Sequence, residues 1–411
     1  MTHSMSKDND FDWKAFEQQA ISRLLKGEEL TGEDGILTPL IQRLLQASID
    51  GEMQAHVAEN RPNRRNGSKG KRVKSTQGLL HIDMPRDRDG SFDSGLLPKR
   101  RTSLGEGLDN KILALYGLGM SYSDIRAHLA EMYGLSVSEA ALTAITDKVV
   151  DELTQWQGRI LQPVYPFVWL DAIHYKVRHE GRVITRALYT VLALGLDGHK
   201  ELLGLYVSEH EGARFWLSVL SDLQARGVND IFVASIDGLK GFPEAIASVF
   251  PHTRVQLCLV HQMRNSLRFV PDKDRRPLTR DLKQVYKAPN RDLAQTAFQS
   301  FETNWGGKYP MIVKSWGANW DQLMEMFEYP EEIRRMIYTT NPVEGVHRQL
   351  RKTTKTKGAF VSDQALLKII YLTYKRISCK WTSVPNNWGL VLQQLYLIFP
   401  DRIPPKINDT L

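Results

Sequence analysis

The sequence has only two cysteines, Cys258 and Cys379, among its 411 residues. Two thiols exclude a disulfide framework and a four-cysteine zinc site, and they are typical of proteins from a reducing cytoplasm. Residues 1–12 are polar and lack the apolar stretch of a secretory signal. No apolar run approaches the roughly eighteen residues that a membrane span needs. These absences favour a cytoplasmic protein without a membrane partner.

The overall composition is that of an ordinary globular protein. Apolar residues form 42% and charged residues 25% of the chain. The length allows two or three domains and a substantial core. The formal net charge of +7 favours a polyanionic partner such as nucleic acid, although basic composition alone is a weak signal.

The N-terminal segment, residues 1–60, carries apolar side chains at helical spacing from residue 11 onward, and Gly27, Gly32 and Gly35 divide it into at least two helices. Helices that are this apolar on one side need a cover. We therefore expect this segment to pack on the rest of the chain or on a second subunit. The second alternative would make the protein a homodimer or a higher homo-oligomer.

Residues 61–104 begin with a basic stretch in which cations alternate with Asn, Gly and Ser. Such an arm neutralises DNA phosphates without reading the base sequence, although the composition fits a solvated loop equally well. A short strand over residues 79–85 and a turn-rich stretch over residues 86–94 follow. The cations of the arm that we assign to DNA are Arg64, Arg65, Lys69, Lys71 and Arg72.

Three helices are predicted over residues 105–160. The second begins with a capping box at Ser121 and the third with another at Ser136, and a turn with a glycine separates the two helices. This arrangement is typical of a helix-turn-helix that reads DNA, although structural helical hairpins share it. The side chains of the third helix that we expect to face a DNA groove are Ser138, Thr143 and Lys148.

From residue 163 the pattern becomes mixed α/β. Strands are predicted near residues 167–175, 186–194, 201–207, 231–237 and 255–260, with helices near residues 211–226 and 242–250. The order β-β-β-α-β-α-β is that of the ribonuclease-H-like fold, in which the first and fourth strands are neighbours. Asp171 lies in the first strand and Asp237 ends the fourth. Because ionised carboxylates are costly to bury, each needs a hydrogen-bond donor, a cation or a metal.

A third carboxylate, Glu344, lies at the head of a predicted helix. The chain between Asp237 and Glu344 is much longer than the compact fold needs. We therefore expect an all-α insertion domain over residues 262–338, which divides the catalytic core into residues 163–261 and 339–411. Our central hypothesis is that Asp171, Asp237 and Glu344 converge on divalent metal ions that cut and join DNA.

Glu344 also has a purely local explanation. Asn341 is a good N-cap, Pro342 suits the first helical position, and Glu344 then stands where a capping glutamate does. The helix behind it is basic and fits either a solvated face or a surface for DNA phosphates. The cations of this helix that we assign to DNA are Arg348, Arg351, Lys352 and Lys355.

Four motifs, in this order, resemble those of Mutator-type transposases of bacterial insertion sequences, which belong to the Asp-Asp-Glu transposases. The motifs are Leu170-Asp171-Ala172, Asp237-Gly238-Leu239-Lys240-Gly241-Phe242, Cys258-Leu259-Val260-His261 and Tyr338-Thr339-Thr340-Asn341-Pro342-Val343-Glu344. The stretch from Pro85 to Phe92 is similar to a family signature too. The resemblance covers roughly residues 50–385. It departs at Gly345-Val346-His347, where the family pattern has Ser and Asn.

The resemblance implies an enzyme that binds the terminal inverted repeats of its insertion sequence and cleaves and transfers DNA strands into target DNA. The cofactor would be two Mg²⁺ ions, which Mn²⁺ can replace, with Asp171 as the bridging ligand and Asp237 and Glu344 on either side. The protein would act in the bacterial cytoplasm, at the nucleoid when bound to DNA. The alternatives are a catalytically inactive DNA-binding relative and a ribonuclease-H-like nuclease.

Two further groups of residues carry weaker expectations from the resemblance. Cys258 and His261 do not suit a structural zinc ion, which needs four ligands, because no second Cys/His pair lies nearby in the sequence. The resemblance implies a structural or DNA-positioning role for them beside the active site. The tryptophans of the insertion domain are expected in its core. The resemblance also leaves open that Trp316 or Trp320 holds a flipped base.

Overall fold

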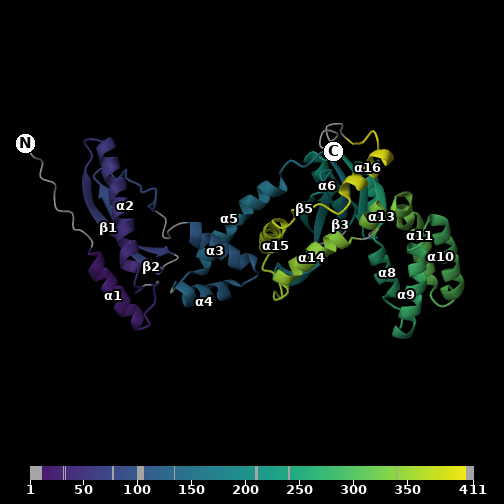
Figure 1. The fold of residues 1–411 in the computed structure, drawn as a ribbon, viewed down its shortest axis with the longest axis horizontal. Coiled ribbons are helices and arrows are strands. Elements are labelled where there is room, and N and C mark those ends of the chain that lie inside the picture. The colour runs from purple at the N-terminus through teal and green to yellow at the C-terminus, as the bar shows by residue number, and fades with distance from the viewer. Residues whose placement is uncertain are drawn as a thin grey trace, which may run out of the picture. The chain divides into compact units, whose positions relative to one another are not determined.

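The structure is a computed structural model. It describes residues 12–30, 32, 34–75, 78–99, 106–133, 135–208, 212–238, 241–338 and 340–403. The chain divides into two compact units, Met1–Lys148 and Val149–Leu411, whose elements are labelled in Figure 1. In the described parts of the chain, no helix combines the length and the apolar character that a bilayer span requires.

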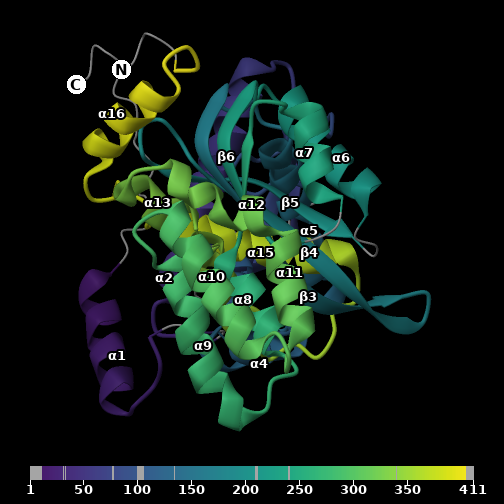
Figure 2. The ribbon, with the colours of Figure 1, turned by 90° about the vertical axis from the view of Figure 1, so that its right-hand side faces the viewer.

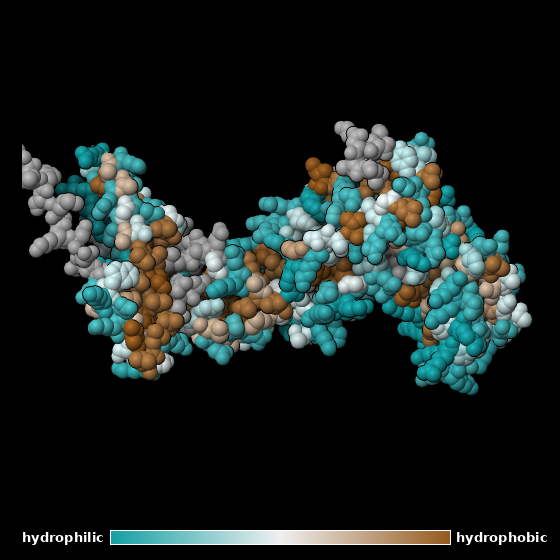
Figure 3. Space-filling model, viewed as in Figure 1, coloured by the Kyte–Doolittle hydropathy of each residue, from teal (hydrophilic) through white to brown (hydrophobic). Residues whose placement is uncertain are grey.

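The first unit begins with two helices, as the sequence predicts, and continues with a β-hairpin. Its first elements are α1 (Trp13–Leu25), α2 (Thr38–Glu59), β1 (Arg65–Ser75) and β2 (Gly78–Asp87). Helix α2 packs on β2, and the core between them contains Ile49, Leu80 and Ile82. No residue of α1 is buried. Leu25 of α1 and Leu44 of α2 are exposed, and brown side chains gather over this part of the molecule in Figure 3.

The predicted basic arm is wrong as a description of the backbone, because most of it forms strand β1. The strand pairs antiparallel with β2, with Lys71 opposite Ile82 and Val73 opposite Leu80. Gly, Ser and Lys have little β propensity, so the composition of β1 did not predict a strand. Strand β2 has the largely alternating pattern of buried and exposed residues that is typical of a strand, and β1 forms by pairing with it.

Three helices follow, as predicted: α3 (Glu106–Gly117), α4 (Tyr122–Tyr133) and α5 (Glu139–Gln157), the last of which runs into the second unit. The capping box at the start of α4 is confirmed, because Asp124 N donates to Ser121 Oγ and Ser121 N donates to Asp124 Oδ2. The predicted start of α5 is two residues early. Ser138, not Ser136, caps this helix by accepting a hydrogen bond from Ala141 N.

The second unit contains the mixed five-stranded sheet that the sequence predicts, in the order β5-β4-β3-β6-β7. Strands β3, β4 and β5 are antiparallel neighbours, whereas β6 is parallel to β3 and β7 is parallel to β6. The elements in chain order are β3 (Val164–His179), β4 (Arg182–Leu194), β5 (Lys200–Ser208), α6 (Ala213–Ala225), β6 (Asp230–Ile236), α7 (Phe242–Val249) and β7 (Arg254–Leu257).

The last predicted strand is longer than the observed one. Strand β7 ends at Leu257, and Leu259 and Val260 belong to helix α8 (Leu259–Leu267). A short apolar run does not distinguish a strand from a buried helix start by its periodicity. This difference matters for the site, because α8 carries His261.

Helices replace strands from α8 onward, which confirms the helical character predicted for residues 262–338. Helices α9, α10 and α11 lie together in Figure 2. Trp316 is a core residue, as expected, and donates a hydrogen bond to Ser266 Oγ. The ring of Trp320 stacks on Phe298. The elements are α9 (Asp272–Tyr286), α10 (Arg291–Trp305), α11 (Pro310–Ala318), α12 (Trp320–Met324), η1 (Glu325–Glu328), α13 (Glu331–Ile337), α14 (Asn341–Thr354), α15 (Asp363–Ser378) and α16 (Trp388–Ile398).

Helices α6 and α14 cover opposite faces of the sheet. Successive residues of a strand point to opposite faces, and two neighbours on β4 identify the faces. Tyr189 contacts the Trp216 ring of α6 at a centroid distance of 4.5 Å. Thr190 contacts His347 of α14. The face that carries Thr190 also carries the candidate site.

Candidate active site

Asp171 lies in the middle of β3, opposite Thr190 of β4. Its side chain is only 6% exposed. Within the described residues, its carboxylate accepts a hydrogen bond at Oδ1 from the backbone N–H of Ala172, at 2.8 Å. Burial raises the pKa of Asp171 above its usual value, while His261 and the Ala172 hydrogen bond oppose that rise. A buried carboxylate with so little compensation is suited to a cation.

Asp237 follows directly on β6. The parallel register pairs Leu170 with Ile236, so Asp171 and Asp237 stand at the same level of neighbouring strands. The charge of Asp237 contributes to the raised pKa of His261. The structure thus places the second predicted aspartate beside the first, at the end of the adjacent strand.

His261 comes from the first turn of α8 and reaches towards two carboxylates. Its Nε2 lies 3.9 Å from Asp171 Oδ1 and 3.9 Å from Glu344 Oε1. Interaction with the Cys258 thiol, together with the charges of Asp171 and Asp237, outweighs burial and raises the pKa of His261 to about 9. The neighbouring thiol and carboxylates thus favour the protonated imidazole in the metal-free site.

Cys258 is the residue that precedes α8, and its sulfur contacts the start of another helix. Sγ lies 3.2 Å from Thr340 Oγ1 and accepts a hydrogen bond from Thr340 N at 3.3 Å. Burial alone would raise the pKa of Cys258, but the interactions with His261 and Thr340 lower it. The thiol joins the end of β7 to the residue before α14.

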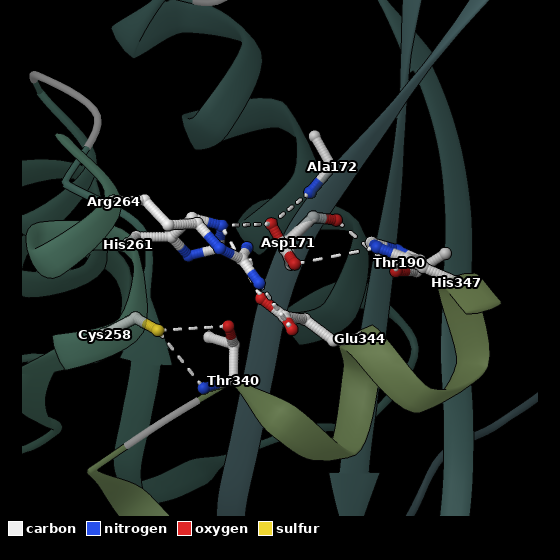
Figure 4. Close-up of polar contacts among 9 residues, drawn as sticks. All are labelled: Asp171, Ala172, Thr190, Cys258, His261, Arg264, Thr340, Glu344 and His347. Atoms are coloured by element: carbon white, nitrogen blue, oxygen red, sulfur yellow. Dashed lines mark hydrogen bonds and ion pairs between the residues drawn. The ribbon is translucent and has the colours of Figure 1, made fainter. Parts of the chain in front are cut away.

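Glu344 lies in the first turn of α14. Its Oε1 accepts from Arg264 Nη1 at 2.7 Å and its Oε2 accepts from Arg264 Nη2 at 3.1 Å (Figure 4). The helix begins at Asn341 with Thr340 in the N-cap position, so the predicted cap at Asn341 is wrong by one residue. The carboxylate faces the site, where Arg264 and His261 are its charged or polar neighbours.

His347 lies one helical turn after Glu344 and is buried below Asp171. Its Nδ1 is 3.6 Å from Asp171 Oδ2, and its Nε2 is 2.6 Å from Thr190 Oγ1. Burial, and then the charges of Arg351 and His261, lower the pKa of His347 to about 3. This imidazole is neutral, in contrast to His261 on the other side of Asp171 (Figure 4).

One group of ligand atoms in the described part of the chain has the spacing of a metal site. Single atoms of Asp171, His261 and Glu344 all lie within 4.8 Å of one another. Two hard carboxylates around one position, one of them buried, fit a divalent cation. Asp237 is not a member of this close group, although it directly follows the adjacent strand β6.

The comparison with known proteins identifies the family. A model of the family described as "Transposase, Mutator family" matches residues 11–384. The chain belongs to the Mutator family of transposases. The four sequence motifs predicted this family, and the prediction is confirmed.

Curated relatives of this Mutator-family chain are similar over nearly their full lengths. The transposase for insertion sequence element ISRM3 from Rhizobium meliloti (strain 1021) is 41% identical over 397 residues, which cover 94% of this chain and 99% of that protein. A probable transposase for an ISRM3-like element from Sinorhizobium fredii (strain NBRC 101917 / NGR234) is 40% identical with the same coverage. A probable transposase for an insertion sequence element from Corynebacterium diphtheriae is 38% identical, covering 78% of this chain and 98% of that protein.

Sequence reasoning missed three residues of the site in this Mutator-family chain. Arg264 lies one turn after His261 on α8. Their spacing places both on one face of a helix, but the sequence pattern predicted a strand at the start of α8. Thr190 is one hydroxyl in an apolar strand. His347 stands where this sequence departs from the family pattern, so the family motif does not point to it.

Several DNA-binding candidates of the first unit already have partners within that unit. Lys71 donates to the carbonyl oxygens of Pro98 and Lys99, and Lys148 forms an ion pair with Asp109 at 2.6 Å. Arg65 is paired with Asp50, and Ser138 serves as the helix cap described above. The remaining candidates of this unit are exposed, namely Arg64, Lys69, Arg72 and Thr143.

The candidates of α14 and of its C-cap, Lys355, lie on one side of that helix. Its apolar residues, such as Val343 and Leu350, are buried. The cations lie on the opposite, solvent-facing side. These exposed cations are Arg348, Arg351, Lys352 and Lys355.

Proposed function

We propose that this chain cleaves the ends of its own insertion sequence and transfers the cleaved DNA strands in a metal-dependent reaction. The observation that carries the proposal is the convergence of Asp171 and Glu344, from β3 and α14, on one position with His261. The two carboxylates are far apart in the sequence. A capping glutamate would not need to face the buried aspartate of a distant strand.

Asp171, Asp237 and Glu344 are the residues that would hold the metal ions, which we propose to be two Mg²⁺ ions, replaceable by Mn²⁺. Bound there, the ions would supply charge stabilisation for the attacking and leaving oxygens of an in-line phosphoryl transfer. The chain itself would mainly position groups. Thr190 and His347 would orient Asp171 from below. Cys258 would fix the start of α14 through Thr340.

The mixed sheet supports a ribonuclease-H-like catalytic core for this site. In that interpretation the core comprises residues 163–261 and 339–411, and residues 262–338 form a helical insertion domain. Both aspartates then lie on neighbouring strands, as the register of β3 and β6 has it. Helix α14 brings the third carboxylate to the same face.

The partner would be double-stranded DNA, both the terminal inverted repeats of the element and the target. The exposed cations of α14 begin one turn after Glu344, where they can contact phosphates of the strand being cut. In the first unit, the exposed cations of β1 and the helices of residues 105–160 are the candidate DNA-binding surface. The exposed apolar residues of α1 support a homo-oligomer that brings two DNA ends together.

A nicking assay tests the proposal. The full-length protein is incubated with Mg²⁺ and duplex DNA that carries an end of the element, and Asp171→Ala and Glu344→Gln are compared with wild type. Both variants should lose nicking and strand transfer. Asp292→Ala, which removes an exposed carboxylate on α10, is the matched control and should remain active. Equal nicking by wild type and Asp171→Ala would remove the enzymatic proposal.

A further inference from the structure

Arg264 forms hydrogen bonds with both carboxylate oxygens of Glu344. The proposed function requires that same carboxylate to bind a metal ion. The two hydrogen bonds are 2.7 and 3.1 Å long and form a bidentate pair. The Arg264 side chain is 58% exposed, whereas that of Glu344 is 20% exposed. The guanidinium is therefore the more solvent-exposed partner of the pair, whose contacts are drawn in Figure 4.

A guanidinium and a divalent cation cannot use the same carboxylate independently. The bidentate pair engages both Glu344 oxygens, and an added metal ion would repel the positive charge at short range. An Arg side chain does not relieve this conflict by losing its proton, because it stays charged at all ordinary pH values. Movement of the guanidinium away from Glu344 relieves this repulsion.

The exposure of Arg264 allows that movement and indicates what receives the group. A guanidinium presents a planar set of donors that matches a phosphate in the same bidentate manner as a carboxylate. Arg264 also lies one helical turn from His261 on α8, beside the position where the proposed reaction places a DNA phosphate. Within the described residues, the hydrogen bonds that hold the Arg264 side chain both go to Glu344.

We propose that Arg264 gates the metal site: its guanidinium holds Glu344 in the metal-free protein, and a DNA phosphate draws it away so that Glu344 can bind metal. This inference rests on the proposed function. By linkage, DNA and metal then favour each other's binding, because each relieves the competition that the other meets.

Metal affinity without DNA tests the gate directly. Mn²⁺ binding to the full-length protein is measured by calorimetry, with no DNA present and no activity readout. Arg264→Gln should bind Mn²⁺ more tightly than wild type, by roughly three- to fivefold for the loss of a partly exposed ion pair. Arg264→Lys, which keeps the charge but loses the planar fork, should lie between the two.

Two controls separate the gate from general effects of charge. Arg268→Gln removes the same charge one turn further along, from an exposed side chain that lies over the Phe269 ring, and should leave Mn²⁺ affinity unchanged. In a Glu344→Gln background, Arg264→Gln should bring no gain, because the carboxylate that it releases is gone. Thermal melts confirm that each variant is folded.

The outcomes distinguish a failure of the Arg264 gate from a failure of the proposed metal-dependent function. If Glu344→Gln weakens Mn²⁺ binding but Arg264→Gln and Arg264→Lys bind like wild type or more weakly, Arg264 does not gate the site and the proposed function stands. If Asp171→Ala and Glu344→Gln both bind Mn²⁺ as wild type does, the metal site itself is wrong and the gate falls with it.

Discussion

The hydroxyl oxygen of Thr190 lies 2.6 Å from Nε2 of His347, a residue 157 positions later in the chain. The same imidazole faces Asp171 Oδ2 through Nδ1, at 3.6 Å. A neutral, buried ring with one nitrogen bonded to a strand hydroxyl has a fixed orientation. Thr190 therefore fixes the orientation of the His347 ring, and that ring in turn limits where Asp171 Oδ2 can lie.

Replacing Thr190 by valine should weaken both the fold and the site. The change keeps the shape of the side chain but leaves Nε2 of His347 without its partner in a buried position, at a cost of about 1–3 kcal/mol. We expect a lower urea midpoint and an Mn²⁺ affinity about tenfold weaker, as for other supports of metal ligands. Thr185→Val, on an exposed position of the same strand, should change neither. Unaltered Mn²⁺ binding by Thr190→Val would contradict the supporting role.

Asp171→Asn should make the metal-free protein more stable while it removes metal binding. Burial raises the pKa of Asp171, so ionising its carboxyl group costs more free energy in the folded state than in the unfolded state. The favourable contribution of this group is complete below its ordinary pKa of 3.8 and is lost as the pH rises through the folded-state value. The advantage of Asp171→Asn should therefore be present at pH 7 and shrink as the medium is acidified.

Urea unfolding with EDTA, at several pH values, measures that difference. Added Mg²⁺ should then stabilise wild type but not Asp171→Asn, because an ion that binds only the folded state raises its stability. Asp292→Asn serves as the exposed comparison and should show neither effect. A variant that is less stable than wild type at pH 7 with EDTA would argue against an uncompensated carboxylate at Asp171.

The parts of the site that the sequence predicts are those with local patterns. Asp171 stands out because it interrupts an apolar strand and Asp237 because it ends one, and the order of elements predicts that the two strands are neighbours. Glu344 has no such pattern. A capping residue explains its position equally well, so its assignment depended on the family motif.

The parts that were missed depend on contacts between distant segments. The apolar run near residue 257 hides the change from β7 to α8, so the alignment of His261 and Arg264 on one helix face was not visible. Strand β1 forms because β2 offers it partners, which its own composition does not reveal. The contact of His347 with Thr190 joins α14 to β4 and has no counterpart in any local spacing.

Asp87 should be essential for the stability of the first unit. Burial alone would raise its pKa, but hydrogen bonds from Ser91, Asn63 and Phe92 outweigh burial and hold the pKa well below its usual range. Donors approach both oxygens, with Asn63 Nδ2 at 2.6 Å and Phe92 N at 3.1 Å. This network gives a structural reason for the motif between Pro85 and Phe92.

Asp87→Ala should lower the unfolding midpoint of the first unit and increase hydrogen exchange in the turn after β2. Because the pKa is depressed, the stabilisation is present above the unfolded-state pKa and disappears as the pH falls through the folded-state value. Asp89→Ala changes an exposed carboxylate two residues away and should have little effect. If the two variants melt alike, the carboxylate network does not hold this turn.

The exposed cations of α14 should contribute to DNA binding through charge alone. Helix α14 buries its apolar side against the sheet, so Arg348 and Lys352 can change without disturbing the core. Arg348→Gln and Lys352→Gln should each weaken binding to every DNA sequence to a similar degree. Each should also reduce the slope of log affinity against log salt concentration by about 0.9, the value for one lost phosphate contact.

Arg214→Gln provides the matched comparison, because Arg214 is exposed on α6, and that helix covers the opposite face of the sheet. All three variants lose one positive charge, so an effect of net charge alone would be the same for each. A local phosphate contact instead requires the salt slope to fall for Arg348→Gln and Lys352→Gln and to remain at the wild-type value for Arg214→Gln. Fluorescence anisotropy with a short duplex, titrated at several salt concentrations, measures the slopes. Equal slopes for the three variants would mean that DNA does not lie along α14, and the strand being cut would then have to reach Glu344 from another side.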